Sequence, residues 1–138
     1  MTSAREIMTE GAECVGADES VVLAAKRMAQ LGVGALPIRG SDNRLMGMLT
    51  DRDIVIKVLA RELDARTTKA GELAQGEVVT VDVDDDTHQI LRAMSSHKVR
   101  RLPVLDGGDL VGMVALADVA RDLPDPQVGD LLEALSTD

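Results

Sequence analysis

The chain carries one sequence pattern twice. The segment MAQLGVGALPI at residues 28–38 aligns without a gap with MSSHKVRRLPV at residues 94–104, and a proline occupies the same place in both. Further along, LMGMLTDRD at residues 45–53 aligns with LVGMVALAD at residues 110–118, after the loss of one loop residue. An internal repeat of this length predicts that one supersecondary unit is built twice.

Each copy predicts the element order β-α-β-β-α, and therefore a mixed α/β (α+β) fold. A short apolar run at residues 14–15, and again at residues 78–81, predicts a first strand. Acidic residues followed by Ser or Thr, at residues 18–20 and 84–87, predict the start of a helix. Gly32 predicts the end of the first of these helices.

Apolar spacing predicts the hairpins and the buried helix faces. Short apolar runs at residues 35–38 and 45–49, joined by a polar turn, predict a hairpin, and residues 106–108 supply the corresponding turn of the second copy. Apolar residues at helical spacing predict the faces that point to the core. These residues are Ala25, Met28 and Ala29 in the first helix, Leu91 and Met94 in its second copy, and Ile54, Val55, Val58 and Leu59 in the helix after the first hairpin.

The repeats divide the chain into a first repeat at residues 1–62, a second repeat at residues 63–124 and a tail at residues 125–138. Pro124 and Pro126 predict the end of the last helix of the second repeat. The tail is predicted to form a short helix.

Charge and composition restrict the partners of the chain. Its 138 residues have a formal net charge of −9 and include no Phe, Tyr or Trp. An acidic chain repels nucleic acids and anionic membranes, and a chain without aromatic rings cannot stack on nucleobases, so we expect neither partner. Cys14 is the single cysteine, which excludes an internal disulfide. The N-terminal residues lack the apolar core of a signal peptide, and we expect a cytoplasmic protein.

The segment GMLTDRD at residues 47–53 is the clearest candidate site. It lies where a predicted strand runs into a helix, and the backbone N–H groups at such a junction attract an anion. Thr50 adds a hydroxyl there, Arg52 could pair with a phosphate, and Asp53 could accept hydrogen bonds from ribose hydroxyls. The same Thr-x-x-Asp spacing is that of a helix capping box, and this alternative stays open.

The repeated motif, with Thr-Asp-Arg-Asp after a Leu-Pro strand, resembles the CBS domain, and the tandem repeat resembles a CBS pair, or Bateman module. The resemblance covers about residues 5–122, and it is strongest to the small stand-alone pairs of the actinobacterial hypoxic response. It implies two repeats packed about a pseudo-twofold axis, two ligand clefts and a homodimer. It also implies an adenosyl ligand such as AMP, ADP, ATP or S-adenosylmethionine, with no obligatory cofactor.

The two copies keep different parts of the family motif. The resemblance places Thr50 and Asp53 at one cleft and Asp118 at the other, where Ala115 and Ala117 have replaced the hydroxyl residue and the arginine. The clefts are therefore expected to differ, and the first keeps the fuller motif.

Arg100 and Arg101 could replace the positive charge that the second cleft lacks. They align with uncharged residues of the first copy. Together with Lys98, they also fit a solvated edge, and we keep both interpretations open. The full set of predicted ligand-binding residues is Thr50, Arg52, Asp53, Asp118, Arg100, Arg101 and Thr80, the last at the strand position that matches Cys14.

No metal site is predicted. His88, His97 and Cys14 do not have the spacing of metal ligands, although a zinc site shared between chains stays an alternative. The acidic run at residues 82–86 lacks the layout of a calcium loop and fits helix capping.

Two functional hypotheses follow. In the first, the chain is a non-enzymatic regulatory or sensor module that binds an adenosyl ligand, and the resemblance links it to a stress or hypoxia response. In the second, it is a structural or protein-interaction dimer with empty clefts, as Ala115 and Ala117 would allow. An enzyme is not predicted, because no nucleophile is paired with a base in a known motif.

Overall fold

The chain forms two compact units. The computed structural model describes residues 2–11, 13–74 and 78–122. The first-repeat unit comprises residues 13–78, and the second-repeat unit comprises residues 1–12 together with residues 79–138. These units differ from the boundaries predicted between the repeats. The N-terminal segment up to residue 12, predicted in the first repeat, belongs to the second-repeat unit, and the segment from residue 63 to 78, predicted in the second repeat, belongs to the first-repeat unit.

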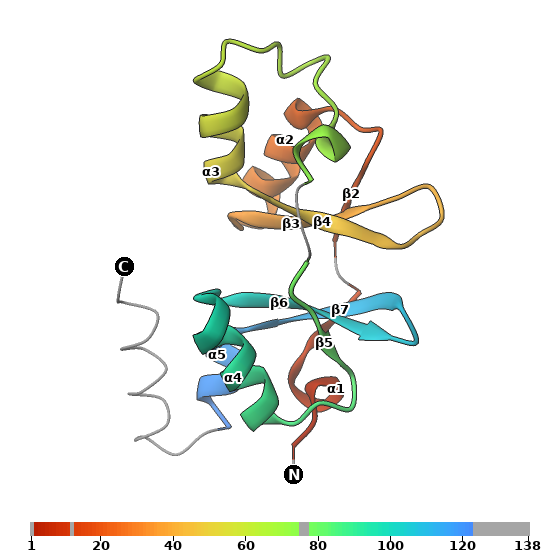
Figure 1. The fold of residues 1–138 in the computed structure, drawn as a ribbon, viewed down its shortest axis with the longest axis vertical. Coiled ribbons are helices and arrows are strands. Elements are labelled where there is room, and N and C mark those ends of the chain that lie inside the picture. The colour runs from red at the N-terminus through yellow and green to blue at the C-terminus, as the bar shows by residue number, and fades with distance from the viewer. Residues whose placement is uncertain (1, 12, 75–77, 123–138) are drawn as a thin grey trace. The chain divides into compact units, whose positions relative to one another are not determined.

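The first-repeat unit contains one sheet and the helices that cover it. In chain order its elements are β2 (Val15–Gly16), α2 (Val21–Leu31), β3 (Ala35–Arg39), β4 (Leu45–Thr50), α3 (Asp51–Ile54), a π-helical turn (Val55–Leu59) and a 3-10 turn (Ala70–Leu73). The sheet order is β2-β3-β4, with β2 parallel to β3 and β3 antiparallel to β4 (Figure 1). We call α3 and the π-helical turn together the α3 segment, residues 51–59.

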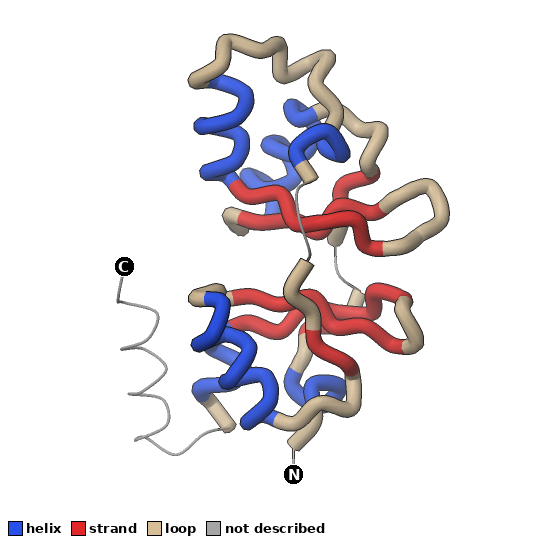
Figure 2. The backbone as a smooth tube through the Cα atoms, in the orientation of Figure 1, coloured by secondary structure: helices blue, strands red, loops and turns tan. Residues whose placement is uncertain are grey.

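The second-repeat unit repeats this plan and adds an N-terminal strand. Its elements are α1 (Ala4–Ile7), β1 (Thr9–Glu10), β5 (Val81–Asp82), α4 (Thr87–His97), β6 (Arg101–Asp106), β7 (Asp109–Ala115) and α5 (Leu116–Ala120). The sheet order is β1-β7-β6-β5. In each unit taken by itself, the helices lie on one side of the sheet (Figure 2). The predicted β-α-β-β-α order is confirmed in both repeats.

The helix ends follow the sequence signals closely. Ser20 caps α2, since its side chain accepts a hydrogen bond of 3.2 Å from the Leu23 N–H, and Gly32 ends the helix with a φ of 67°. Asp86 caps α4 in the same way. The position that matches Gly32 is occupied by Lys98, which holds a φ of 53°. A left-handed backbone normally favours glycine, so the second copy adopts this turn with a less suited residue.

The buried faces of the long helices differ in part from the prediction. The buried residues are Val21, Ala24 and Met28 in α2, and Thr87, Ile90 and Met94 in α4. Met28 and Met94 are thus buried as predicted, and Leu91 is half buried. Ala25 and Ala29 are exposed, so the prediction was wrong for both. Small alanines carry little information about which side of a helix faces the core.

The α3 segment also departs from its predicted face. Val58 is buried, but Val55 and Leu59 are 53% and 62% exposed, and the prediction that they point to the core was wrong. A π-helical turn has more residues per turn than an α-helix, so spacing rules for α-helices misplace its side chains. An apolar surface is left on the outside of this segment.

The first strand of each repeat is shorter than predicted. β2 begins at Val15 rather than Cys14, and β5 begins at Val81, so residues 78–80 are not part of a strand. Each of these strands pairs through two residues only, with β3 and β6 respectively. The hairpin strands, in contrast, are confirmed, and the first hairpin extends its predicted strands by one residue each.

In each unit, an equivalent backbone hydrogen bond holds the segment that comes from outside the repeat in the sequence. The Ala4 N–H donates to the Asp85 carbonyl over 2.8 Å, and the Ala70 N–H donates to the Glu19 carbonyl over the same distance. Both alanines are completely buried. Residues 63–74, which open the second repeat in the sequence, therefore cover the first-repeat unit. This exchange depends on contacts between distant residues, which local patterns do not reveal.

The N-terminal segment also passes very close to β7. Thr9 pairs with Met113 in the antiparallel β1-β7 ladder. A Cβ atom added to Gly112 would lie 2.6 Å from the Thr9 carbonyl oxygen, closer than real Cβ atoms approach. Glycine is needed at this position because two backbones approach each other there.

Aliphatic side chains and methionine form the core of each unit. Fully buried residues of this kind each contribute about 1.5–3 kcal/mol through removal of apolar surface from water. The largest of them are Leu36, Ile38, Leu49, Ile90, Met94 and Leu102. A core without aromatic rings is therefore sufficient for both units.

The predicted tail at residues 125–138, with Pro124 and Pro126, lies outside the described residues. Within the described part of the chain, no helix is both long enough and apolar enough to cross a bilayer.

Candidate functional site

The junction between β4 and α3 holds the two central residues of the predicted site. The Asp53 N–H donates to Thr50 Oγ1 over 3.0 Å, and the Thr50 N–H donates to Asp53 Oδ2 over 2.9 Å. This is the capping box that the sequence left open as an alternative. The Thr50 hydroxyl hydrogen and further lone pairs of the carboxylate remain able to bond a ligand.

Lys57 is a site residue that the sequence analysis missed. Its Nζ lies 3.3 Å from Asp53 Oδ1, and both side chains are 22% exposed. The signal was present in the sequence, since a carboxylate and a lysine four residues apart on a helix face each other. The pair places a positive charge directly beside the Asp53 carboxylate.

The start of β3 brings a carboxylate into the same junction. The Asp51 N–H donates to the Gly34 carbonyl over 2.9 Å, and a Cβ atom on Gly34 would lie 3.0 Å from Asp51 Oδ2. The Asp51 carboxylate thus occupies the space beside the start of the strand. A phosphate group at this point would meet a like charge.

The junction between β7 and α5 repeats the backbone geometry with different side chains. The Leu116 N–H donates to the Arg100 carbonyl over 2.8 Å, and the Ala115 N–H donates to Asp118 Oδ2 over 2.8 Å. The other carboxylate oxygen of Asp118 pairs with Arg121, a contact that the sequence analysis also missed. Asp118 is therefore oriented as Asp53 is, although no hydroxyl stands at the position of Ala115.

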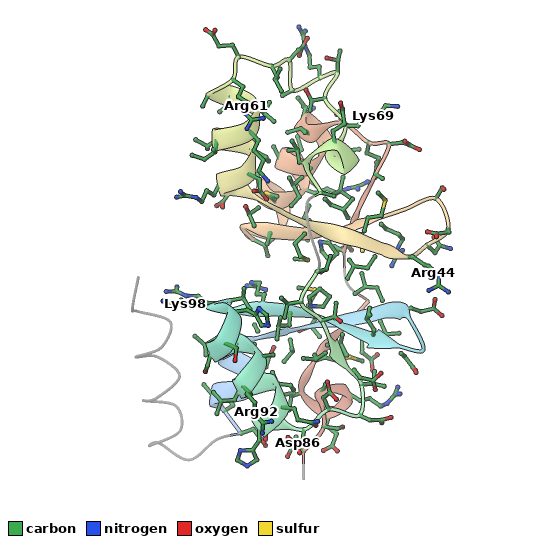
Figure 3. All side chains as sticks on the ribbon, in the orientation of Figure 1. Arg44, Arg61, Lys69, Asp86, Arg92 and Lys98 are labelled. Atoms are coloured by element: carbon green, nitrogen blue, oxygen red, sulfur yellow. The ribbon has the colours of Figure 1, made fainter. Side chains whose placement is uncertain are left out.

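The second junction is much more positive than the first. Leu116 takes the place of the Asp51 carboxylate, and Arg100 and Arg101 stand at the start of β6 with exposed side chains. Within the described part of the chain, neither arginine forms an ion pair. Lys98 lies at the adjoining end of α4 (Figure 3). The arrangement favours an anionic group such as a phosphate.

Two predicted site residues, Arg52 and Thr80, do not lie with the other groups of the two junctions. Arg52 is exposed, whereas the neighbouring Asp53 is half buried, so the arginine faces outward from the α3 segment. Thr80 is half buried just before β5 and has no contact with Asp118 among the hydrogen bonds of the described residues.

Cys14 lies beside a polar network rather than in a reactive site. Arg27 donates over 2.8 Å to the Cys14 carbonyl and over 2.8 and 3.1 Å to the Glu19 carboxylate. The hydrogen bond from Arg27 lowers the pKa of Glu19 below its usual range. Burial raises the pKa of the Cys14 thiol, which disfavours the nucleophilic thiolate. Across residues 2–11, 13–74 and 78–122, no three His, Cys, Asp or Glu side chains gather in a way that could hold a metal ion.

Comparisons with known proteins agree with the duplicated architecture. The CBS domain family matches at residues 4–60 and again at residues 70–125. The chain is 48% identical over 135 residues to Hypoxic response protein 1 of Mycobacterium tuberculosis, covering 98% of this chain and 94% of that protein.

Solved structures show the same fold. A crystal structure of Hypoxic Response Protein I with two coordinated zinc ions has a TM-score of 0.83 and 51% sequence identity, and the match covers 89% of this chain and 100% of that chain. A structure of CBSX2 in complex with AMP has a TM-score of 0.76 at 23% identity, covering 88% of this chain and 96% of that one. The chain belongs to the CBS domain family and consists of a tandem CBS pair.

Proposed function

We propose that the chain is a non-enzymatic regulatory module that binds an adenosyl ligand, and that it acts in the cytoplasm. The observation that carries the proposal is the pair of exposed arginines, Arg100 and Arg101, whose backbone pairs with the end of β7 and the start of α5, where the carboxylate of Asp118 is held in place. A nucleotide offers the two complementary groups, a phosphate for the arginines and ribose hydroxyls for the carboxylate.

The two repeats contribute to recognition in different ways. In the first repeat, Thr50 and Asp53 present a hydroxyl and a carboxylate to neutral parts of a ligand, while Asp51 repels phosphate. In the second repeat, Arg100 and Arg101 attract phosphate. The sequence predicts two unlike clefts, of which the first keeps the fuller motif. In our proposal, ribose recognition uses both repeats and phosphate recognition uses the second.

The family supports an adenosyl ligand and a regulatory role. The structurally similar CBSX2 is complexed with AMP, and the name of the mycobacterial relative points to a response to hypoxia. We extend both properties to this chain as part of the proposal. The candidates are AMP, ADP, ATP and S-adenosylmethionine.

We do not extend the zinc ions of the mycobacterial structure to this chain. The described residues do not gather three ligating side chains. A zinc site within one chain therefore has no ligand set among the described residues, and a site shared between two chains stays the alternative.

A second candidate function is an interaction module that binds no nucleotide. It is favoured by the hydrogen bonds that Asp53 and Asp118 already make to the backbone, because capping alone accounts for their orientation. The two candidates are distinguished by whether a ligand stabilises the folded protein.

Thermal unfolding with added nucleotide tests the proposed function. A ligand that binds only the folded state increases the free energy of unfolding, by about 2.7 kcal/mol at a ligand concentration of a hundred times its Kd. The temperature at the midpoint of unfolding rises as a result. We expect one or more of the four candidates to raise the midpoint, and Asp118→Asn to reduce that rise. Asp109→Asn is the matched control, since Asp109 is exposed on β7 and away from the junction. No rise with any candidate at millimolar concentration would reject the proposal and favour the interaction module.

A further inference from the structure

The two junctions share one backbone geometry and differ in a matched pair of side chains. The Asp51 N–H donates to the Gly34 carbonyl over 2.9 Å in the first repeat, and the Leu116 N–H donates to the Arg100 carbonyl over 2.8 Å in the second. Each repeat thus joins the residue just before a hairpin strand to the first residue of the helix after the hairpin. We call Gly34 with Asp51, and Arg100 with Leu116, the two junction pairs.

In the first junction pair, glycine makes room for a carboxylate. A Cβ atom on Gly34 would lie 3.0 Å from Asp51 Oδ2. The other carboxylate oxygen, Oδ1, accepts a hydrogen bond of 2.8 Å from the Arg52 N–H. Among the described residues, Asp51 forms no ion pair. The negative charge of Asp51 is therefore held beside the start of β3 without a cation to offset it.

The other charged groups of the first junction offset each other or point elsewhere. Lys57 Nζ lies 3.3 Å from Asp53 Oδ1, so this lysine and this carboxylate neutralise each other. Arg52 is exposed and faces outward from the α3 segment. The Asp51 carboxylate is left as the net charge of the junction, and it repels a phosphate. An uncharged hydroxyl is not repelled, and Thr50 and Asp53 are still able to bond to it.

The second junction pair gives its junction the opposite charge. Leu116 supplies no carboxylate, and Arg100 and Arg101 are exposed. The Asp118 carboxylate is offset by Arg121. An arginine beside a retained aspartate would be neutralised, whereas the two replacements together reverse the sign of the charge. The change at the two aligned positions is therefore concerted.

We propose that the junction pairs assign different ligands to the two repeats. The first junction takes a nucleoside without a phosphate group, and the second takes a phosphorylated nucleotide. This inference rests on the proposed function and deepens it, because it makes Gly34 and Asp51 specificity determinants. The first junction selects mainly by rejection, since a phosphate beside an unpaired carboxylate costs free energy and a nucleoside avoids that cost. The chain then responds to the nucleoside and to the nucleotide separately.

Isothermal titration calorimetry of the full chain with adenosine and AMP tests the assignment, because the two ligands differ only in the phosphate. Asp118→Asn weakens the second junction and so reports the first, and Asp53→Asn does the reverse. Asparagine keeps an oxygen for the backbone hydrogen bond, and circular dichroism checks the fold. We expect the Asp118→Asn chain to bind adenosine about tenfold or more tightly than AMP, the size of one charged contact. The Asp53→Asn chain should show the opposite preference.

An Asp51→Asn substitution isolates the charge, because the amide keeps the shape of the carboxylate. In the Asp118→Asn chain, it should reduce the preference for adenosine over AMP by about tenfold. Asp42→Asn is the matched control and should leave the preference unchanged. Asp42 is exposed in the β3-β4 turn and accepts a hydrogen bond of 3.0 Å from the Arg44 N–H, as Asp51 does from the Arg52 N–H.

Exchange of the whole junction pair should reverse the preference. Gly34→Arg with Asp51→Leu gives the first repeat the side chains of the second, and Gly34 does not hold a positive φ, so the backbone accepts a side chain there. In the Asp118→Asn chain, this exchange should make AMP the tighter ligand. Equal affinities for adenosine and AMP before the exchange, or an unchanged preference after it, would overturn the inference and leave the proposed function standing. Absence of binding heat from the wild type with both ligands at millimolar concentration would instead reject the proposed function, and the inference with it.

Discussion

Thr50 and Asp53 bond to each other's backbone, with N–H to oxygen distances of 3.0 Å from Asp53 to Thr50 and 2.9 Å from Thr50 to Asp53. The residues that the family motif assigns to ligand recognition therefore also begin the helix after the first hairpin. Any substitution at this junction changes helix capping as well as ligand binding, and experiments must separate the two effects.

Loss of the cap should destabilise the protein without any ligand. We expect Thr50→Ala and Asp53→Ala each to lower the free energy of unfolding by about 1 kcal/mol, as for other helix caps. Thr50→Ser keeps the hydroxyl and should cost much less. Urea denaturation of the free protein measures these differences. Equal stability of the alanine and serine variants would show that the hydroxyl does not cap α3 in solution.

The ion pair between Glu19 and Arg27 should make stability depend on pH. Arg27 lowers the pKa of Glu19, so the carboxylate contributes stability above its unfolded pKa of about 4.3, and the contribution is lost as pH falls through the folded pKa. We expect Arg27→Ala to cost about 1 kcal/mol at pH 7, as a partly exposed pair would.

The difference in unfolding free energy between wild type and Arg27→Ala should shrink as the pH falls below the unfolded pKa of about 4.3 and through the lower folded pKa of Glu19. Ala93 occupies the matching position of the second repeat, so alanine is compatible with this helix. Urea denaturation at several pH values checks the trend. A difference that is constant with pH would assign the cost to packing or to the hydrogen bond with Cys14.

Two aligned glycines should respond differently to a methyl group. A Cβ on Gly112 would lie 2.6 Å from the Thr9 backbone oxygen, whereas a Cβ on Gly47 would lie 3.1 Å from the Ala74 side chain. We expect Gly112→Ala to lower the free energy of unfolding by about 2 kcal/mol or more, and Gly47→Ala to lower it by less. The reason is that the Thr9 backbone is harder to displace than the Ala74 side chain. Hydrogen exchange should show that Gly112→Ala frees the β1 amides. Unchanged protection of β1 would contradict the close approach.

Local features of the fold were predictable from the sequence because they depend on near neighbours. Ser20 and Gly32 mark the ends of α2, and the hairpins follow from alternating apolar residues and polar turns. The CBS family was recognisable from the Thr-Asp-Arg-Asp motif of the first copy, the aspartate kept at the matching place of the second copy, and the Leu-Pro motif that occurs in both. These signals act within a few residues of the structure that they specify.

The remaining features depend on contacts or geometry that local patterns do not encode. The burial of Ala4 and Ala70 depends on segments far away in the sequence. The exposure of Val55 and Leu59 depends on a π-helical turn, which no residue type in this segment predicts. At the site, the pairing of Asp53 with Lys57 was readable from their spacing, but the crowding of Asp51 against Gly34 required the fold.

Isothermal titration calorimetry with AMP and ATP, on the wild type and on an Arg100→Gln/Arg101→Gln double variant, tests the central claim most directly. The wild type should bind at least one of the two nucleotides. The variant, which keeps the Asp53 and Asp118 carboxylates, should bind the nucleotides more weakly, with the larger loss for ATP because it carries more phosphate charge. Absence of binding heat from the wild type at millimolar nucleotide, or equal affinities of the two proteins for ATP, would contradict the account.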